Sequence, residues 1–313
     1  MNVYDLAKRI GVSTATVSRV LNNSGPVKAQ TRQRVLDALE ASNYTVNDVA
    51  RSLAMRQTQN VAILTTDIRE YYYSHTAYFI EQRMAETGYH VFLCNTGGNA
   101  ARQAGYIQTM LGKRVAAMVV LGSSMRDDVL ITALLKASRT VPVVMTNANL
   151  IAENTFCIER DDAAGIRLAA ARLMERGVRS LCFVSDYLYH SDQVKRQVFT
   201  DIAEHSGLKY VLCAQEEALP RAEGYVCSSD MVAARLIKRL DSAGVRVPYD
   251  ALVIGYDNTD LAPLVTPALT SIDSDIARQS RIAADTLQAL LSCGERPLNH
   301  VLITPTLKIR ESA

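Results

Sequence analysis

Residues 12–22 read Val12-Ser13-Thr14-Ala15-Thr16-Val17-Ser18-Arg19-Val20-Leu21-Asn22, and this stretch decides the fold of the N-terminal region. Its serine at position 13 is placed to cap a helix from Thr14 to Leu21. Upstream, apolar side chains at helical spacing predict a short helix over Tyr4–Ile10, which a glycine ends. A third helix is predicted from about residue 28 or 31 to residue 42. Two short helices joined by a tight turn and closed by a third make a helix-turn-helix domain.

The second predicted helix is the one that enters the major groove in a helix-turn-helix. On its outward side, Arg19 can make a fork-shaped contact to a guanine edge, and Thr14 and Ala15 can touch bases or a thymine methyl. Short polar side chains suit phosphate contacts, which position a protein without reading sequence; these are Ser13, Thr16, Ser18 and Asn22. A small helical domain with solvated basic residues is the alternative, because the helical pattern alone is weak evidence.

Charge is distributed unevenly along the chain. Residues 1–59 hold eight Lys and Arg against four Asp and Glu, whereas the rest of the chain holds 26 against 28. A small basic head on a slightly acidic body suggests a polyanion as the partner of the head alone.

Composition excludes several classes of protein. With 48% hydrophobic and 21% charged residues, the 313-residue chain is of ordinary globular type, and its length predicts two or three folding units. The sequence contains no apolar run of about 18 residues, so no membrane span is predicted. The N-terminus does not resemble a signal peptide. None of the six cysteines stands in a C-x-x-C pair, so buried free thiols in a reducing cytoplasm are expected.

An enzyme is one alternative function, and the motifs argue against it. The chain has no Gly-x-Ser-x-Gly, and Gly97-Gly98-Asn99 is no phosphate loop. The five histidines lack metal-ligand spacing, so no catalytic residue, metal or cofactor is predicted. His190 and Asp192 could suggest acid–base chemistry, but proximity in sequence is weak evidence for it.

From Asn60 onward, short apolar runs alternate with amphipathic stretches. The predicted strands are Val61–Thr65, Val91–Cys94, Ala117–Leu121, Val143–Thr146, Leu181–Ser185, Val211–Cys213, Gly224–Cys227 and Leu252–Tyr256. Helices are predicted over Thr76–Thr87, Ala163–Arg176 and Ser229–Ser242. Continuous apolar strands that alternate with helices predict parallel sheets covered on both faces, in two similar subdomains. Ligands of such sheets bind beyond the carboxyl ends of the strands.

Residues 12–22 closely resemble the signature of the lactose-repressor/galactose-repressor (LacI/GalR) family of bacterial regulators. The resemblance extends over essentially the whole chain, through Val27, Thr31, Val35, Tyr44, Asn47, Ala50, Arg51, Ser52 and Leu53, then Asp67-Ile68 and residues 253–258, 269–272 and 304–312. It implies an α/β fold. An N-terminal three-helix helix-turn-helix head and a hinge helix would precede two doubly wound parallel-sheet subdomains of periplasmic-binding-protein type.

In this family, residues matching Asn47 to Met55 form a hinge helix that orders on operator DNA. A leucine matching Leu53 wedges into the minor groove, where an apolar side chain can unstack one base step. The resemblance therefore adds Tyr44, Asn47, Leu53 and Ala54 to the predicted DNA contacts. By its residue type alone, Leu53 would be taken as a core leucine. The family usually has Tyr-x-Pro-Asn before the hinge, whereas this chain has Tyr44-Thr45-Val46-Asn47, so the backbone there is less restricted.

The predicted domains follow from this layout. Residues 1–46 form the DNA-binding domain, and residues 47–59 form the hinge helix and linker. Residues 60–313 form the effector-binding and dimerisation domain, whose subdomains comprise roughly residues 60–158 with 275–290 and residues 159–274 with 291–313.

By position, both subdomains should line an effector cleft. The first should contribute Asp67, Tyr72, Tyr73 and Ser123, and the second Asp161, Asp186, Lys195, Arg196, Ser229, Asp230 and Asp257. Aromatic rings can stack on a sugar face, while carboxylates and a guanidinium can hold hydroxyls. In the alternative interpretation, the tyrosines belong to the core or surface and Asp257 merely caps a helix.

The sensing half departs from the family pattern. The usual Arg-x-x-Gly-Phe appears as Lys195-Arg196-Gln197-Val198-Phe199, so Lys195 stands in register and Arg196 is one place off. Which of the two takes the role of the ligand-contacting arginine stays open. The usual Asn-Asp pair is Ser229-Asp230, and these changes leave the identity of the effector open.

The resemblance implies a sequence-specific DNA-binding transcriptional regulator, by family default a repressor of carbohydrate-utilisation genes. Its implied partners are double-stranded operator DNA, a second copy in a homodimer, and a small polar, sugar-like effector bound between the two subdomains. A free sugar-binding protein is the second alternative, but the attached head and the absent signal peptide argue against it. Whether the effector releases or tightens DNA binding stays open.

Overall fold

The chain divides into two units, Met1–Arg56 and Gln57–Ala313, in a computed structural model. The structure describes residues 3–21, 25–41, 58–122, 127–185, 190–215, 217–292 and 294–313. Of the predicted hinge helix and linker, residues 47–59, only residues 58 and 59 fall within these ranges. Each unit has its own hydrophobic core.

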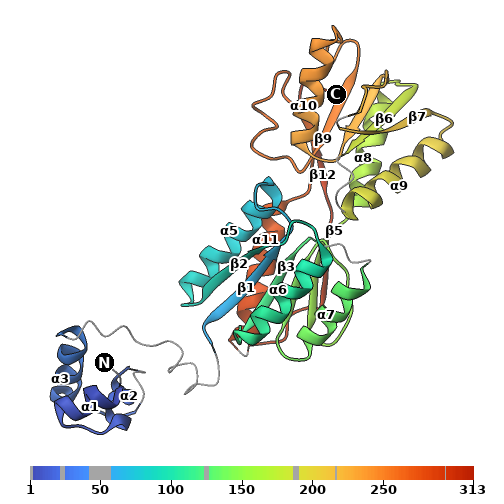
Figure 1. The fold of residues 1–313 in the computed structure, drawn as a ribbon. Helices are drawn as coiled ribbons and strands as arrows, with labels where there is room; N and C mark the ends of the chain where they lie inside the picture. Colours follow the sequence, from blue (N-terminus) through green and yellow to red (C-terminus); the bar gives the residue numbers. More distant parts are fainter. Residues whose placement is uncertain are drawn as a thin grey trace. The chain divides into compact units, whose positions relative to one another are not determined.

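The N-terminal unit contains α1 (Val3–Ile10), α2 (Thr14–Leu21) and α3 (Ala29–Ala41) (Figure 1). Leu6, Val17 and Val35 are fully buried at its centre. Gly11 has a φ of 67°, a left-handed conformation that glycine adopts without steric cost, and it allows the sharp turn between α1 and α2. Ser13 caps α2, because its Oγ accepts a hydrogen bond of 3.1 Å from the Thr16 backbone N–H. The predicted helix-turn-helix is therefore confirmed.

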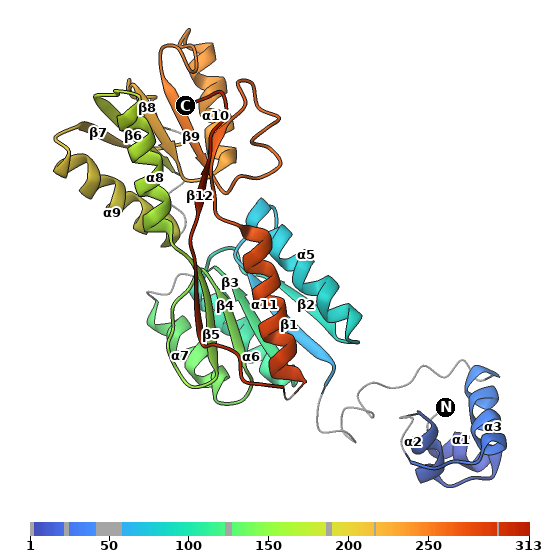
Figure 2. The ribbon, with the colours of Figure 1, turned by 180° about the vertical axis from the view of Figure 1, so that it is seen from behind.

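The second unit begins with a six-stranded parallel sheet in the order β11-β5-β4-β3-β1-β2. Its strands are β1 (Asn60–Thr65), β2 (His90–Asn95), β3 (Ala117–Leu121), β4 (Val143–Thr146), β5 (Thr155–Arg160) and β11 (His300–Ile303). Four helices cover it: α5 (Tyr71–Glu86), α6 (Ala100–Gly112), α7 (Asp128–Ser138) and α11 (Ile276–Leu291). Helices α5 and α11 cover one face, and α6 and α7 cover the other (Figures 1 and 2).

A second six-stranded sheet has the order β12-β10-β9-β8-β6-β7. Its strands are β6 (Ser180–Ser185), β7 (Lys209–Ala214), β8 (Gly224–Cys227), β9 (Leu252–Tyr256), β10 (Thr270–Asp273) and the antiparallel β12 (Thr306–Lys308). The covering helices are α8 (Asp162–Glu175), α9 (His190–His205) and α10 (Asp230–Ser242). Helices α8 and α9 pack on one face and α10 on the other. The predicted pair of doubly wound subdomains is confirmed.

The last strands correct the predicted subdomain boundaries. Residues 291–313 were all expected in the second subdomain, but β11 pairs with β5 in the first sheet. The backbone N–H and C=O groups along the edge of β5 need partners, and the backbone of β11 supplies them. The chain then crosses to β12, which pairs with β10. Strand β5 also runs to Arg160, two residues beyond the predicted boundary at 158.

Free thiols lie inside both sheets. Cys94, Cys157, Cys182, Cys213 and Cys227 are buried and unpaired, as predicted, and Cys293 lies outside the described residues. Burial raises the pKa of the Cys182 thiol to about 12, which keeps it protonated and unreactive. In the described part of the chain, no helix is long and apolar enough to cross a membrane.

Gly255 in β9 allows a close approach that positions the loop after this strand. A Cβ at this position would lie 2.4 Å from Asp230 Oδ1 and 2.6 Å from Leu269 Cδ2. Both neighbours are fully buried, so Gly255→Ala should lower the free energy of unfolding by about 1–3 kcal/mol through overpacking. Urea denaturation measures this loss. Gly105→Ala in α6 is the control, because a Cβ there meets nothing within 4 Å and should stabilise the helix by roughly 0.5–1 kcal/mol. Equal effects of the two changes would contradict the prediction.

Candidate functional site

The predicted DNA-reading residues on α2 face away from the core of the head. Val17 and Val20 are buried, whereas Ala15 and Arg19 are exposed. Of the remaining predicted contacts, Ser13 is exposed and Thr14, Thr16 and Ser18 are partly exposed. The stem of Arg19 lies beside Gly25, whose added Cβ would come within 3.7 Å of Arg19 Cδ. Other predicted contacts lie outside the described residues, namely Asn22, Tyr44, Asn47, Leu53 and Ala54.

The centre of the predicted effector site is an ion pair between the two sheets. Arg160 ends β5 in the first sheet, and Asp257 follows β9 in the second. The Arg160 Nη1 donates to Asp257 Oδ1 at 2.6 Å, and the two side chains are only 4% and 12% exposed. Ser274, which follows β10, accepts from the same nitrogen and donates to the same oxygen, each at 3.0 Å. Asp257 has a φ of 93°, and its backbone N–H donates to Ile272 O at 2.8 Å. No helix begins there, so the helix-cap interpretation of Asp257 is wrong.

The predicted tyrosines belong to the interior beside this pair. Tyr72 is buried; its hydroxyl donates to Gln279 Oε1 at 3.0 Å and is hydrogen-bonded to the Thr146 hydroxyl at 2.8 Å. Burial raises the pKa of Tyr72 to about 12. The guanidinium of Arg160 lies 4.7 Å from the centre of the Tyr72 ring, within the range of a cation–π contact. Tyr73 is also buried and packs against Gly122, at the end of β3.

Lys195, rather than Arg196, belongs to the charged cluster around this ion pair. The cluster comprises Tyr72, Arg160, Asp162, Lys195, Tyr256, Asp257 and Ser274. The Lys195 side chain is buried, whereas Arg196 is exposed. The Lys195 Nζ lies 3.7 Å from the centre of the Tyr256 ring and donates to Ser228 O at 3.1 Å. The Tyr256 hydroxyl in turn donates to Asp162 Oδ1 at 2.8 Å.

Asp230 fixes the loop that carries Asp257. This fully buried carboxylate accepts from the backbone N–H of Thr259 at 2.6 Å, from its hydroxyl at 2.9 Å, and from the Ser271 hydroxyl at 2.5 Å. Burial raises the pKa of Asp230 to about 7, although the bonds from Ser271 and Thr259 oppose the shift. Its neighbour Ser229 caps α10 through the Val232 N–H at 3.3 Å.

Two further predicted carboxylates are bonded to their own surroundings. Asp67 pairs with Arg69 at 2.6 Å, and the hydrogen bond from that side chain lowers the pKa of Asp67. Asp161 caps α8 by accepting from the Ala164 N–H at 2.8 Å. Ser123 and Asp186 lie outside the described residues. The contacts therefore link Asp257 to Tyr72, pack the Tyr73 ring edge-on against Tyr72 at 5.1 Å, and connect Asp230 to the Asp257 loop.

Sequence reasoning missed four members of the cluster: Arg160, Asp162, Tyr256 and Ser274. Arg160 had a usable signal, because it ends β5 two residues after the buried apolar run Phe156–Ile158. Such a charge is buried only when it is paired. Its partner is 97 residues away and could not be identified from one sequence.

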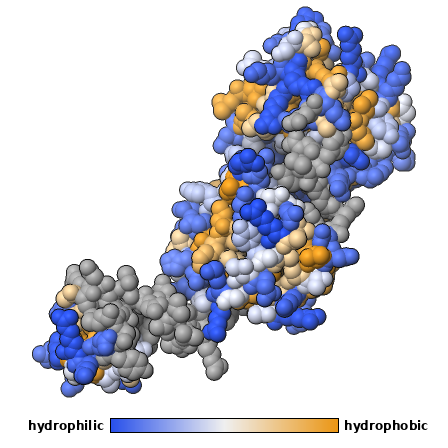
Figure 3. All heavy atoms as spheres, viewed as in Figure 1, coloured by the Kyte–Doolittle hydropathy of each residue, from blue (hydrophilic) through white to orange (hydrophobic). Residues whose placement is uncertain are grey.

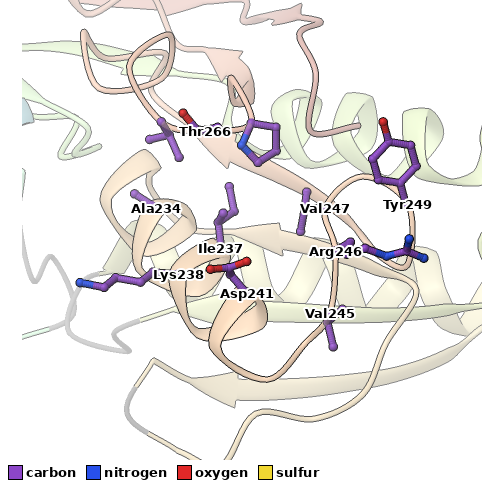
Figure 4. Close-up of a pocket in the computed structure, with 11 residues that line it drawn as sticks. Ala234, Ile237, Lys238, Asp241, Val245, Arg246, Val247, Tyr249 and Thr266 are labelled. Atoms are coloured by element: carbon purple, nitrogen blue, oxygen red, sulfur yellow. The ribbon is translucent and has the colours of Figure 1, made fainter.

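A groove of about 480 Å³ lies elsewhere on the second sheet's half (Figure 4). It is formed by α10 and by the loops on either side of β9, with Ala234, Ile237, Lys238, Asp241, Val245, Arg246, Val247, Tyr249, Val265, Thr266 and Pro267 as its lining. None of the predicted effector residues that the structure describes lines it. The surface of the first sheet's half has its own apolar side chains among polar ones, on the side where α5 lies (Figure 3). Exposed members on α5 and β2 are Tyr78, Phe79, Phe92 and Leu93.

Comparisons with known proteins identify the family. The sequence model described as bacterial regulatory proteins, lacI family, matches residues 2–47, and the periplasmic binding protein-like domain matches residues 167–313. The HTH-type transcriptional repressor PurR of Pectobacterium carotovorum subsp. carotovorum (strain PC1) is 30% identical over 332 residues, which cover 99% of this chain and 96% of the relative. The chain belongs to the LacI family of bacterial regulatory proteins. An HTH-type transcriptional regulator of Lachnoclostridium phytofermentans is 29% identical, covering 100% of this chain and 99% of the relative.

Solved structures of the lac repressor and of another transcriptional regulator share the fold. The lac repressor dimer bound to operator and the anti-inducer ONPF has a TM-score of 0.84 at 22% identity, covering 100% of this chain and 98% of that one. The transcriptional regulator CelR in complex with cellobiose has a TM-score of 0.70 at 22% identity, with both chains covered completely. The predicted family, fold class and DNA-binding role in transcription regulation are thus confirmed.

Proposed function

We propose that this LacI-family regulator represses carbohydrate-utilisation genes, and that a small sugar-like effector changes its affinity for operator DNA. The observation that supports this best is the cluster around Arg160 and Asp257. Its members come from the carboxyl ends of β5 and β9, in different sheets. A ligand that contacts both ends would favour one arrangement of the sheets over another, which is how an effector shifts a two-state equilibrium.

A sugar is proposed as the effector because structurally similar proteins were solved with sugars bound. CelR was solved with cellobiose, and other LacI-type neighbours with D-xylulofuranose and with ribose. Several relatives are instead named PurR, so the effector search must include nucleobases and nucleosides beside sugars. We further propose that the chain is a binding protein without catalytic activity.

A homodimer is part of the proposal. One head reads one half-site, so a pseudo-palindromic operator requires two copies related by a two-fold axis. The exposed apolar side chains on α5 and β2 offer a surface that a second copy would cover. In this scheme the hinge, residues 47–56, becomes helical only on DNA, because a helix this short is marginal in water. Sedimentation at micromolar concentration should show the dimer.

The test of the proposed function is reciprocal coupling. A thermal-stability screen identifies the effector, because a ligand that binds only the native state raises the melting temperature. Operator DNA must then change effector affinity by the same factor by which the effector changes operator affinity. Asp257→Asn should weaken effector binding and leave the operator affinity of the free protein nearly unchanged. Asp250→Asn is the control, since Asp250 pairs with Arg246 at the exposed surface.

Leu53→Ala tests operator binding separately from effector binding. It should weaken operator binding and leave effector binding to the free protein intact. Unchanged effector affinity in Asp257→Asn would remove Asp257 from the site. Unchanged operator affinity in Leu53→Ala would remove Leu53 from the DNA interface.

A further inference from the structure

The described carboxylates of the predicted effector site are all bonded within the protein. Arg69 holds Asp67, the first turn of α8 holds Asp161, and Thr259 and Ser271 hold Asp230. Asp257 accepts from Arg160 and Ser274. Carboxylates are the groups with which a protein would grip the hydroxyls of a neutral sugar. Such a sugar would be left with Oδ2 of Asp161 and Oδ2 of Asp257, which accept no bond from a described residue.

Arg160 has hydrogen-bond donors that no described residue uses. Its hydrogen bonds to described residues leave from Nη1 alone, to Asp257 and Ser274. The Nε atom is buried, and no described residue accepts a hydrogen bond from it. Nε and Nη2 form the second edge of the guanidinium, a planar fork that matches the two oxygens of a carboxylate or a phosphate. A buried donor without a partner is uncommon in native proteins, and its presence suggests a ligand.

The neighbours of Arg160 fix the direction of this fork. Asp257 and Ser274 hold Nη1, and the Tyr72 ring lies against the guanidinium. Tyr72 is itself fixed by Gln279, whose amide nitrogen donates to Asn147 Oδ1 and to Ile158 O, each at 2.8 Å. Because these contacts hold the side chain before any ligand arrives, little conformational entropy remains to be lost on binding.

Lys195 supplies a second buried positive charge in the same cluster. An ammonium has three donors, and among the described residues only Ser228 O accepts a bond from Lys195. Tyr256, over whose ring the ammonium lies, connects it through Asp162 to the surroundings of Arg160. Donors thus remain on both cations of the cluster.

We propose that the effector carries an acidic group, a carboxylate or a phosphate, and that the Nε–Nη2 edge of Arg160 binds it. Lys195 contributes the second positive charge, and the bond to Asp257 orients the guanidinium. This inference rests on the proposed function and narrows the effector from a sugar-like compound to a polyhydroxy acid or a phosphate ester.

The test compares matched probes on the full-length protein. Thermal denaturation is followed with D-glucose, D-gluconate and D-glucose 6-phosphate, then with the corresponding neutral, acid and phosphate forms of other sugars and of nucleosides. The acid or the phosphate form of a sugar or nucleoside should raise the melting temperature where its neutral form does not. A response to acids alone identifies a carboxylate, and a response to phosphate esters alone identifies a phosphate. Either response supports the proposal.

Arg160→Lys tests the fork itself. Lysine keeps the positive charge beside Asp257 but lacks the bidentate edge, so binding of the responding probe should weaken at least about tenfold. Arg239→Lys is the matched control, because Arg239 bonds to the backbone of Gln215 and Glu217 in the second sheet's half. The melting temperatures without probe report whether both variants fold. The comparison of charged with neutral probes needs no variant.

Three outcomes would overturn the inference: no response to either charged arm, a response confined to neutral compounds, or unchanged binding in Arg160→Lys. A neutral compound that binds and also shifts operator affinity would leave the proposed function standing while this inference fails. Failure of the proposed function would look different, since a bound compound would leave operator affinity unchanged.

Discussion

Arg160→Met is expected to lower the free energy of unfolding of the second unit by about 3–5 kcal/mol, because it leaves a buried carboxylate without its cation. Asp257 is only 12% exposed in its side chain, and Arg160 Nη1 lies 2.6 Å from its Oδ1. Methionine fills much of the space of the arginine stem, so the loss reports on charge more than on packing. The remaining bond from Ser274 to Asp257 is neutral and cannot replace the guanidinium.

Urea denaturation followed by circular dichroism measures this loss. Arg246→Met is the control, because the Arg246–Asp250 pair lies at the exposed surface and its loss should cost far less than that of the buried pair. Adding Asp257→Asn to Arg160→Met should restore part of the stability, since it removes the uncompensated charge. The ion-pair assignment fails if Arg160→Met costs no more than Arg246→Met, or if the second substitution adds its full separate cost.

Most of the fold could be predicted because local patterns encode it. Strands β3, β4, β8 and β9 have the predicted bounds, since each is an uninterrupted apolar run between turns. Strand β5 ends in Glu159 and Arg160, and β12 has only three residues at a sheet edge. Neither follows the apolar pattern of a central strand. Tertiary pairing defines these strands, so local sequence cannot locate them.

The candidate site was less predictable than the fold, because its contacts join distant residues. Position after a strand was enough to place Asp257 near the junction of the sheets. The same reasoning placed Tyr72 in a cleft, whereas its hydroxyl is bonded in the interior. Register favoured Lys195 and residue type favoured Arg196, so the sequence left the choice open, but α9 turns the first inward and the second outward. Which side chain is buried depends on how the helix packs, and one sequence gives no direct measure of that.

Arg19→Ala should remove about 1–3 kcal/mol of base discrimination at each half-site, and roughly twice that for a dimer on a symmetric operator. Arg19 is exposed on α2, opposite the buried Val17 and Val20, so its loss should not unfold the head. The expected signature is a smaller ratio of operator to random-DNA affinity at fixed salt, confined to one base position of each half-site. A phosphate contact would instead weaken both kinds of DNA alike.

Gel-shift titrations against operator and random DNA, at two salt concentrations, distinguish these cases. Arg9→Ala is the matched control, since Arg9 is an exposed arginine in the last turn of α1, outside the predicted reading helix. If Arg9 binds only phosphate, its removal should weaken both DNAs equally and reduce the salt slope by about one. For Arg19→Ala, an unchanged ratio of operator to random-DNA affinity would mean that α2 does not read bases through this side chain. Discrimination would then have to come from its other outward residues or from the deformation of the operator.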